Sequence, residues 1–311
     1  MRPVLKTNNP VLLSFAQSLL SEAEIESVVF DENASIMDGS LGILPRRLMV
    51  ADDDFLRGQM VLREGIARNA RPTETTKDTF LGGRLTIEQP TSGFRAGLDA
   101  VMLAAAVPAQ AGDVVLELGS GAGTASLCLA ARVPSVSITG VEIESDLVRI
   151  SNQNATANQL GDRVVFVTVD ALDLPSDMKH DFSHVMCNPP FHGGDGERSP
   201  DESRARATHD DGSLRAWLEV GVKRTASGGT FTTIVRADRL GEILMALPQA
   251  GSRVFPLWPR AGEAARRVIV QLHKGSRAPQ ELCAGLVLHR NDGAYADEAD
   301  VILRGAKELE L

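Results

Sequence analysis

The chain has 311 residues, of which 43% are hydrophobic and 23% charged, so it is long enough to bury one large core or two smaller ones. This composition excludes a disordered or fibrous protein, and no stretch approaches the roughly 20 apolar residues of a membrane-spanning helix. The net charge of -9 disfavours indiscriminate binding to nucleic acids, and the lack of a signal-peptide pattern leads us to expect a cytoplasmic protein.

The three cysteines lie far apart in the sequence and form no C-x-x-C pair. This spacing disfavours a zinc site, a redox couple or a framework of disulfides, so we predict no metal site. We expect buried structural thiols at Cys128, Cys187 and Cys283.

The first 66 residues have the pattern of a small α/β module, which we predict to be ferredoxin-like and which contains no catalytic motif. Apolar residues recur at helical spacing over residues 10–23. A second helix is predicted over 52–64, because three consecutive aspartates at its start favour the positive end of a helix dipole. Strands of this module are predicted at 4–7, 26–30 and 47–50.

Residues 67–78 are polar, contain Pro72 and lack apolar periodicity, so we predict a linker there and a second domain over 79–311. This domain opens with a predicted hairpin at 80–89 that turns at Gly82-Gly83. Strands and helices then alternate, which predicts a mostly parallel sheet covered by helices on both faces. The expected strands are 114–118, 136–141, 164–169, 184–187, 230–235 and 268–273, and the expected helices are 98–107, one ending at 132, and 145–158.

A glycine-rich segment, ELGSGAG at residues 117–123, follows the first of these strands and opens a helix. Its glycines, Gly119, Gly121 and Gly123, let a ligand approach the backbone at the carboxyl end of the strand. The dinucleotide fingerprint needs its third glycine at position 124, which is a threonine. The spacing therefore disfavours NAD.

Two acidic residues end the next two strands. Glu142 lies where a carboxylate can accept hydrogen bonds from both hydroxyls of a ribose, and Asp170 lies where it can meet an adenine amino group. Each acid alone could simply cap a helix. Because ligands of open α/β sheets bind at the carboxyl ends of the strands, the set predicts a nucleotide-like cofactor site that includes Glu117, Gly119, Gly121, Gly123, Glu142 and Asp170.

The segment Asn188-Pro189-Pro190-Phe191 directly follows the fourth strand, beside the predicted crevice. An exocyclic aromatic amine is a poor nucleophile because its lone pair is delocalised into the ring, and acceptors on its two N–H bonds favour a tetrahedral, reactive nitrogen. Asn188 supplies one carbonyl oxygen, Pro189 a second from its backbone, and Phe191 a flat face for a base. The pattern predicts in-line methyl transfer from a sulfonium to such an amine, and the alternative is an ordinary strand-to-loop break. Pro190 and His192 are expected to contact the substrate, and Cys187 to pack in the interior.

Residues 223–277 are basic although the chain as a whole is acidic. They contain ten lysines and arginines against three acidic residues. A local basic face is therefore possible, and a merely solvated surface is the alternative. Within this stretch we expect Arg236, Arg260 and Arg266 to bind the substrate.

Five segments of the chain match those of one enzyme family: FRAGLDAV at 94–101, ELGSGAG at 117–123, GVEIE at 140–144, NPPF at 188–191 and DGAYADEADVILRG at 292–305. Through them the chain from about residue 79 to the end resembles the bacterial tRNA N6-adenine methyltransferases that modify an adenine beside the anticodon of a valine tRNA. The resemblance covers about three quarters of the chain. The first 66 residues resemble a small family of α/β modules called signal-transducing domains, through TNNP at 7–10 and GSLG at 39–42.

The methyltransferase resemblance implies a class I fold, a Rossmann-like sheet of seven strands of which the last is antiparallel. It implies that S-adenosylmethionine is the cofactor and that tRNA is the partner. It also implies that Gly119, Gly121, Glu142 and Asp170 contact the cofactor, that Asn188 and Phe191 hold the target adenine, and that Arg95 and Asp99 border the cofactor pocket.

Three other functions remain open. Phe191-His192 after Asn-Pro-Pro also resembles ribosomal-RNA guanine-N2 methyltransferases, which act on a different exocyclic amine. Related enzymes with an Asn-Pro-Pro-Tyr motif methylate a glutamine amide of release factors. The alternative from another class is a noncatalytic RNA-binding or regulatory module, which would need neither an intact glycine loop nor an intact Asn-Pro-Pro-Phe.

Overall fold

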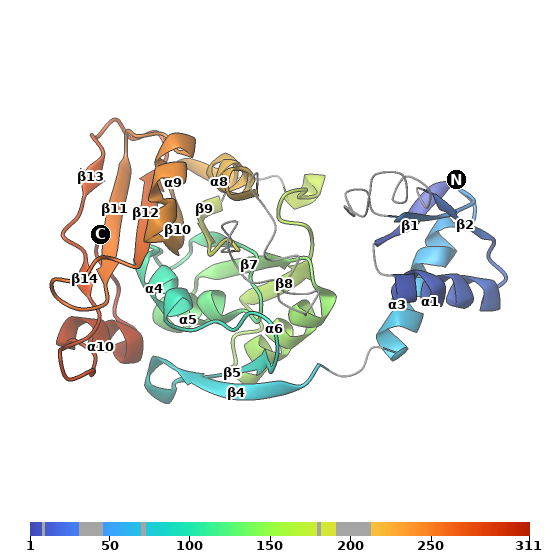
Figure 1. The fold of residues 1–311 in the computed structure, drawn as a ribbon, viewed down its shortest axis with the longest axis horizontal. Coiled ribbons are helices and arrows are strands. Elements are labelled where there is room, and N and C mark those ends of the chain that lie inside the picture. The colour runs from blue at the N-terminus through green and yellow to red at the C-terminus, as the bar shows by residue number, and fades with distance from the viewer. Residues whose placement is uncertain (8–9, 31–45, 70–72, 179–181, 191–212) are drawn as a thin grey trace. The chain divides into compact units, whose positions relative to one another are not determined.

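The computed structural model describes residues 1–7, 10–30, 46–69, 73–178, 182–190 and 213–311 (Figure 1). The chain forms two compact units, Met1–Thr73 and Glu74–Leu311. We call them the amino-terminal and the carboxyl-terminal unit. No helix among the described residues is long and apolar enough to cross a membrane.

The amino-terminal unit contains a three-stranded antiparallel sheet with the order β1-β3-β2. Apolar residues at helical spacing, such as Leu13, Ala16 and Leu20, bury one side of the first helix against the central strand. The described elements of this unit have the order β-α-β-β-α, which is that of a ferredoxin-like fold without its last strand. Its elements are β1 (Arg2–Thr7), α1 (Pro10–Glu22), β2 (Ser27–Phe30), β3 (Arg46–Val50) and α3 (Phe55–Asn69).

Two elements extend into residues 67–78, where a linker was predicted. Helix α3 continues to Asn69, and strand β4 (Thr75–Phe80) begins at Thr75. The part of β4 before Phe80 was not predicted, because among the described residues this strand pairs with only one neighbour, β5 (Leu85–Pro90), and therefore carries polar residues where a strand in a sheet interior would alternate. The aspartates at 52–54 form a turn before α3 and not its first turn.

The main sheet of the carboxyl-terminal unit has the predicted class I form. Its long strands have the order β11-β12-β10-β9-β6-β7-β8, in which β12 alone is antiparallel to its neighbours. Two short strands, β13 and β14, pair with β11 and extend the edge. The strands are β6 (Val114–Leu118), β7 (Ser137–Glu142), β8 (Val164–Thr168), β9 (Phe182–Cys187), β10 (Thr225–Arg236), β11 (Ser252–Trp258), β12 (Arg267–His273), β13 (Glu281–Leu282) and β14 (Leu286–Val287).

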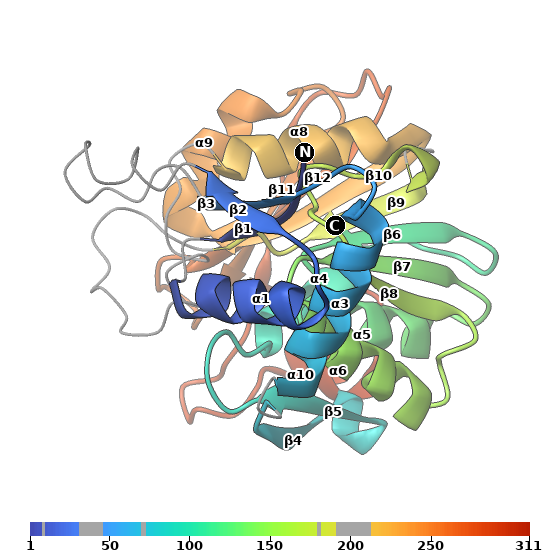
Figure 2. The same ribbon diagram turned by 90° about the vertical axis from the view of Figure 1, so that its right-hand side faces the viewer.

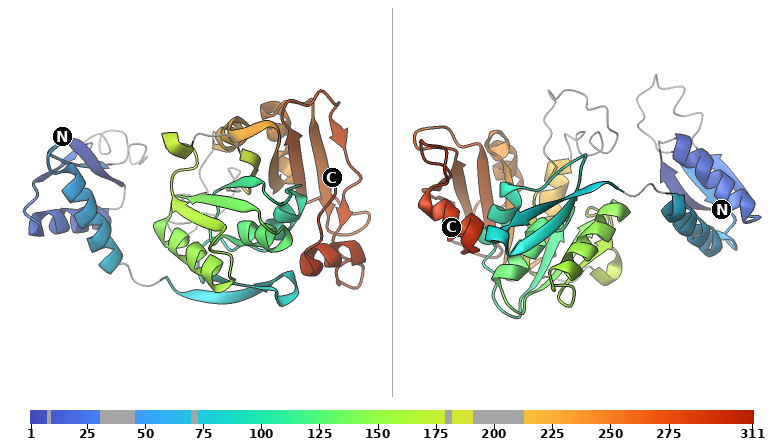
Figure 3. Two further views of the ribbon diagram at one scale, coloured as in Figure 1. Left: turned by 180° about the vertical axis from the view of Figure 1, so that it is seen from behind. Right: turned by 90° about the horizontal axis from the view of Figure 1, so that it is seen from below.

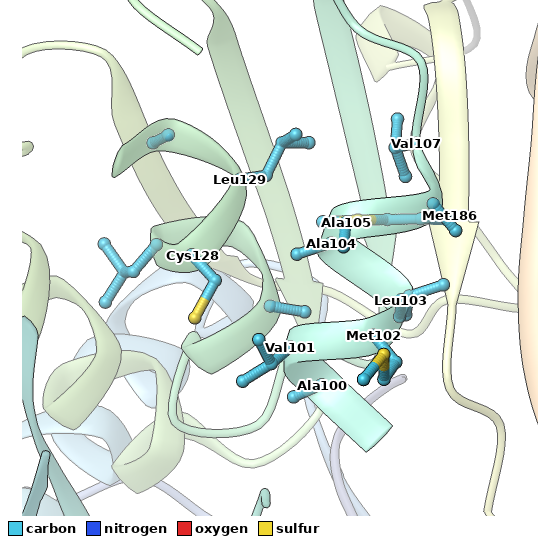
Figure 4. Close-up of a cluster of buried hydrophobic side chains, with 14 of the residues drawn as sticks. Ala100, Val101, Met102, Leu103, Ala104, Ala105, Val107, Cys128, Leu129 and Met186 are labelled. Carbon is cyan, nitrogen blue, oxygen red and sulfur yellow. The ribbon is translucent and has the colours of Figure 1, made fainter. Parts of the chain in front are cut away.

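Helices cover both faces of this sheet. Figure 2 shows α5 and α6 on one side of strands β6 to β9 and α8 on the other. The first face includes α4, whose small apolar residues pack closely on α5: in Figure 4, Val101 and Ala104 lie on the side of Cys128, and Leu103 lies toward Met186 of β9. The helices are α4 (Leu98–Ala106), α5 (Thr124–Arg132), α6 (Ser145–Ala157), α8 (Ser213–Arg224), α9 (Leu240–Ala246) and α10 (Asp297–Gly305).

The predicted hairpin at 80–89 is present as β4 and β5, joined by a short 3-10 turn, Leu81–Gly83. Gly82 has a φ of 66°, a conformation that glycine adopts without strain. The hairpin forms a sheet of its own, and Figure 3 shows it lying along α6.

Candidate functional site

Four parallel strands end side by side at one edge of the main sheet. Leu118 of β6 is in register with Val141 of β7 and with Cys187 of β9, and Glu142 of β7 is in register with Thr168 of β8. The segments that follow these strands therefore meet at this edge, as expected for an open α/β sheet. They carry the glycine loop (residues 119–123), Glu142, Asp170 and Asn188.

The glycine loop is held to the sheet by its own backbone. The amides of Gly119 and Ser120 donate to the carbonyl of Val141 at 2.9 and 3.0 Å. A Cβ at Gly119 would lie 2.7 Å from the indole of Trp217, and one at Gly123 would lie 2.6 Å from the ring of Phe166. Around Gly121 nothing lies within 4 Å of a Cβ, so the loop is open to a ligand at this residue.

Glu142 lies beside this opening. Its carboxylate accepts hydrogen bonds from the amide of Gly121 at 3.0 Å and from those of Ile143 and Glu144 at 2.8 and 3.1 Å. Burial raises the pKa of Glu142, and the three backbone hydrogen bonds oppose the increase. A carboxylate has about four acceptor positions, so Glu142 retains capacity for a hydroxyl of a ligand.

Glu117, which was predicted to bind the cofactor, has hydrogen-bond partners within the protein. Its side chain is 3% exposed and accepts hydrogen bonds from the amide of Ser126, at 3.1 Å, and from the Ser126 hydroxyl. Glu117 thus caps the amino-terminal end of α5. The backbone amides in the first turn of a helix have no acceptor within the helix, and Glu117 accepts a hydrogen bond from one of them. Burial raises the pKa of Glu117 from 4.5 to about 8.

Asn188 presents an acceptor that no described residue satisfies. Its Oδ1 is buried and lacks a hydrogen-bond partner, and the same is true of the hydroxyls of Ser120 and Thr124 at the glycine loop. A buried polar atom without a partner costs about 1 to 3 kcal/mol, so such atoms usually have a ligand or water as partner. Pro189 is buried and Pro190 half-buried beside it, whereas Phe191 and His192 lie outside the described residues.

The thiols of this region are not nucleophiles. Burial raises the pKa of Cys187 to about 12, and its thiol donates to the hydroxyl of Thr233 at 3.4 Å. Burial also raises the pKa of Cys128. The predicted interior packing is confirmed for these two residues, while Cys283 is half-buried.

Three further predicted cofactor residues have partners within the protein. Asp170 follows β8 and accepts a hydrogen bond from the amide of Leu172 at 2.8 Å. Arg95 donates to the carbonyl of Pro90 at 2.7 Å and forms an ion pair with Asp78, which fixes the turn before α4. Asp99, in the first turn of α4, forms an ion pair with Arg267 at 2.8 Å. Arg267 is the first residue of β12 and lies at the same edge of the sheet as the glycine loop.

The basic stretch 223–277 is divided between the two edges of the sheet. Arg236 ends β10 opposite the start of β12, and Arg260 and Arg266 lie in the connection from β11 to β12, on the edge of the glycine loop. Arg236 pairs with Asp238 at 2.5 Å and Arg260 with Glu263 at 3.1 Å. Arg266 is exposed and has no ion pair among the described residues. At the opposite edge lie Lys223, Arg253, Lys274 and Arg277.

Several residues at the site were not identified from the sequence. Trp217 comes from α8, about one hundred residues after the loop that it covers, and no local pattern indicates that contact. The exposed apolar side chains of Ile143 and Leu172 follow the two acidic strand ends and could have been found from that position. Ser120 and Thr124 could have been found as hydroxyls within the glycine loop and the helix start.

Both units match known families. Residues 1–66 match the family described as "Putative prokaryotic signal transducing protein". Residues 96–202, which include the glycine loop and Asn188, match the family described as "Methyltransferase small domain".

Relatives cover most of the carboxyl-terminal unit. The tRNA1(Val) (adenine(37)-N6)-methyltransferase of Vibrio campbellii is 29% identical over 225 residues, which cover 71% of this chain and 92% of the relative. The enzyme of the same name from Vibrio parahaemolyticus is 30% identical over 218 residues, which cover 68% of this chain and 88% of the relative. A crystal structure described as "a predicted O-methyltransferase", protein Atu636 from Agrobacterium tumefaciens, is 24% identical with a TM-score of 0.58. The match covers 68% of this chain and 98% of that chain, and it shows the fold alone. The chain thus belongs to the family of these Vibrio enzymes, and it is an S-adenosylmethionine-dependent methyltransferase.

Proposed function

We propose that this methyltransferase methylates N6 of an adenine in tRNA, in the anticodon-loop region of a valine tRNA. The observation that carries the proposal is the buried Oδ1 of Asn188, which has no partner among the described residues. The names of the Vibrio relatives, which describe this reaction, support it.

The chemistry follows from the acceptors at the end of β9. Asn188 Oδ1 accepts one N–H of the adenine amino group, and the backbone carbonyl of Pro189, which is buried beside it, accepts the other. Both hydrogen bonds strengthen as the nitrogen becomes tetrahedral, so they stabilise the transition state more than the ground state. Phe191 supports the base by stacking, and Pro190 and His192 complete its contacts.

The loop residues hold the cofactor, which supplies an electrophilic methyl group on a sulfonium. Glu142 would accept hydrogen bonds from the ribose hydroxyls of the cofactor, next to the open backbone at Gly121. The hydroxyls of Ser120 and Thr124, which have no partner among the described residues and lie at the positive end of α5, would bind the carboxylate of the cofactor's amino-acid part. Asp170 would accept a hydrogen bond from the adenine amino group of the cofactor. The apolar side chains of Ile143 and Leu172 would lie against the faces of this adenine ring.

The arginines at the edge of the glycine loop contact the RNA backbone. Arg266 is exposed and has no ion pair among the described residues, so it can bind phosphate without losing an interaction. Arg236 and Arg260 exchange their acidic neighbours Asp238 and Glu263 for phosphates. Because those ion pairs are exposed, their loss costs little.

Nucleoside analysis tests the proposed target. Unmodified valine tRNA is incubated with the protein and S-adenosylmethionine that carries a labelled methyl group, and the digested RNA is separated by liquid chromatography. Labelled N6-methyladenosine is the expected product. Labelled N2-methylguanosine, or label that is found only in protein, would contradict the assignment to adenine. Cofactor binding without transfer to any RNA or protein would indicate the noncatalytic function.

A further inference from the structure

One buried side chain of α6 connects two separate segments of the carboxyl-terminal unit. Asn154 is 2% exposed. Its Oδ1 accepts the amide of Glu88 in β5 at 2.8 Å, and its Nδ2 donates to the Glu88 carbonyl at 2.9 Å. The same Nδ2 donates to the carbonyl of Ala122, in the glycine loop, at 3.0 Å. All donor capacity of the amide group is therefore used.

A second asparagine repeats the contact to β5 without reaching the loop. Asn158 accepts the amide of Thr86 at 3.0 Å and donates to the Thr86 carbonyl at 2.8 Å. The spacing is favourable because four residues of a helix and two residues of a strand both advance about 6 Å. The two side-chain amides thus replace a neighbouring strand along β5, and only Asn154 extends this ladder to the glycine loop.

The carbonyl of Ala122 depends on Asn154 for its orientation. In a regular helix the amide of Ser126 would donate to this carbonyl, but here it donates to Glu117. On either side of Ala122 are Gly121 and Gly123, with φ of 54° and 84°, and glycine has access to other conformations at low cost. The Ala122 residue is 7% exposed, so a carbonyl that lost Asn154 would lack water as a substitute.

We infer that Asn154 is a positioning residue for methyl transfer, which holds the glycine loop in the conformation that binds S-adenosylmethionine. It acts through the Ala122 peptide and does not touch the cofactor. The inference rests on the proposed binding of the cofactor at the glycine loop, and it is independent of which RNA or nucleotide is methylated.

A pair of alanine variants separates this role from simple packing. Asn154→Ala and Asn158→Ala each remove the contacts of one amide to β5, but only the first removes the hydrogen bond to Ala122. We expect Asn154→Ala to weaken the binding of S-adenosylhomocysteine, measured by calorimetry without RNA, by about tenfold or more. Asn158→Ala should change this affinity by less than about threefold, although urea unfolding should show that both variants lose stability.

Kinetics and a third variant complete the test. If Asn154→Ala misplaces the loop, its KM for S-adenosylmethionine rises. Its kcat, measured at saturating cofactor, falls by a smaller factor. Asn154→Asp keeps an acceptor for Glu88 but cannot donate to Ala122, so it should bind S-adenosylhomocysteine as weakly as Asn154→Ala, and it serves if the alanine variant does not fold. Equal affinities for the variants at 154 and 158, or wild-type affinity in Asn154→Asp, would overturn the inference. Wild-type protein that binds S-adenosylhomocysteine but does not methylate tRNA would contradict the proposed target alone.

Discussion

Replacing Glu117 by glutamine tests whether this residue is a neutral cap of α5. Burial raises its pKa from 4.5 to about 8, so the folded protein keeps a proton that the unfolded chain loses. The stabilisation is complete below pH 4.5 and disappears as the pH rises through about 8. At about 1.4 kcal/mol per unit, the wild-type protein loses about 2 kcal/mol of unfolding free energy between roughly pH 6 and pH 8 because of this group. Glutamine keeps the acceptor for Ser126 but does not titrate.

Urea unfolding at several pH values measures this effect. Both tryptophans, Trp217 and Trp258, belong to the carboxyl-terminal unit, so their fluorescence reports on that unit alone. The difference in unfolding free energy between Glu117→Gln and wild type should shift in favour of the variant by about 2 kcal/mol over this range. Asp162→Asn, which changes an exposed carboxylate, should show a constant difference from wild type. A constant difference for Glu117→Gln as well would refute the buried neutral acid.

Three further substitutions test the site. Gly119→Ala places a Cβ 2.7 Å from Trp217 at a φ of 68°. It should therefore lower the unfolding free energy by about 2 kcal/mol or more and abolish cofactor binding. A double variant with Trp217→Leu should recover part of the lost stability. Glu142→Ala should weaken S-adenosylhomocysteine binding about 10- to 100-fold by calorimetry, and unchanged affinity would exclude Glu142 from the ribose site. Arg266→Ala should reduce the salt dependence of tRNA binding by about one phosphate contact, whereas Arg277→Ala, at the opposite edge, should not.

The arrangement of the strands could be predicted because it depends on local patterns. Apolar runs that alternate with helical segments predicted the parallel sheet, and the strand ends then placed Gly119, Glu142 and Asn188 at one edge. Strand β11 was not located because Pro256 interrupts its pattern. Pro256 has no amide hydrogen to donate to a neighbouring strand. The structure tolerates it because it lies in the gap between the two short strands, of which β13 pairs with Val254 and β14 with Leu257.

The roles of individual side chains depend on contacts that sequence does not show. Glu117 stands in the glycine motif, yet its carboxylate turns toward Ser126, because a strand directs successive side chains to opposite faces. The basic composition of residues 223–277 left open whether they form a single face, and β10, β11 and β12 carry these charges to two edges of the sheet. Asn154 and Trp217 act on the loop from elements that are distant in sequence.

The proposed methyl transfer depends on the amide oxygen of Asn188, and an alanine substitution removes this acceptor. Transfer of a labelled methyl group to valine tRNA and the affinity for S-adenosylhomocysteine are measured on the same preparation. We expect Asn188→Ala to lower kcat by about 100- to 1,000-fold, as for the loss of a transition-state hydrogen bond, while the affinity changes by less than about twofold. Normal turnover by this variant would contradict the proposed acceptor role.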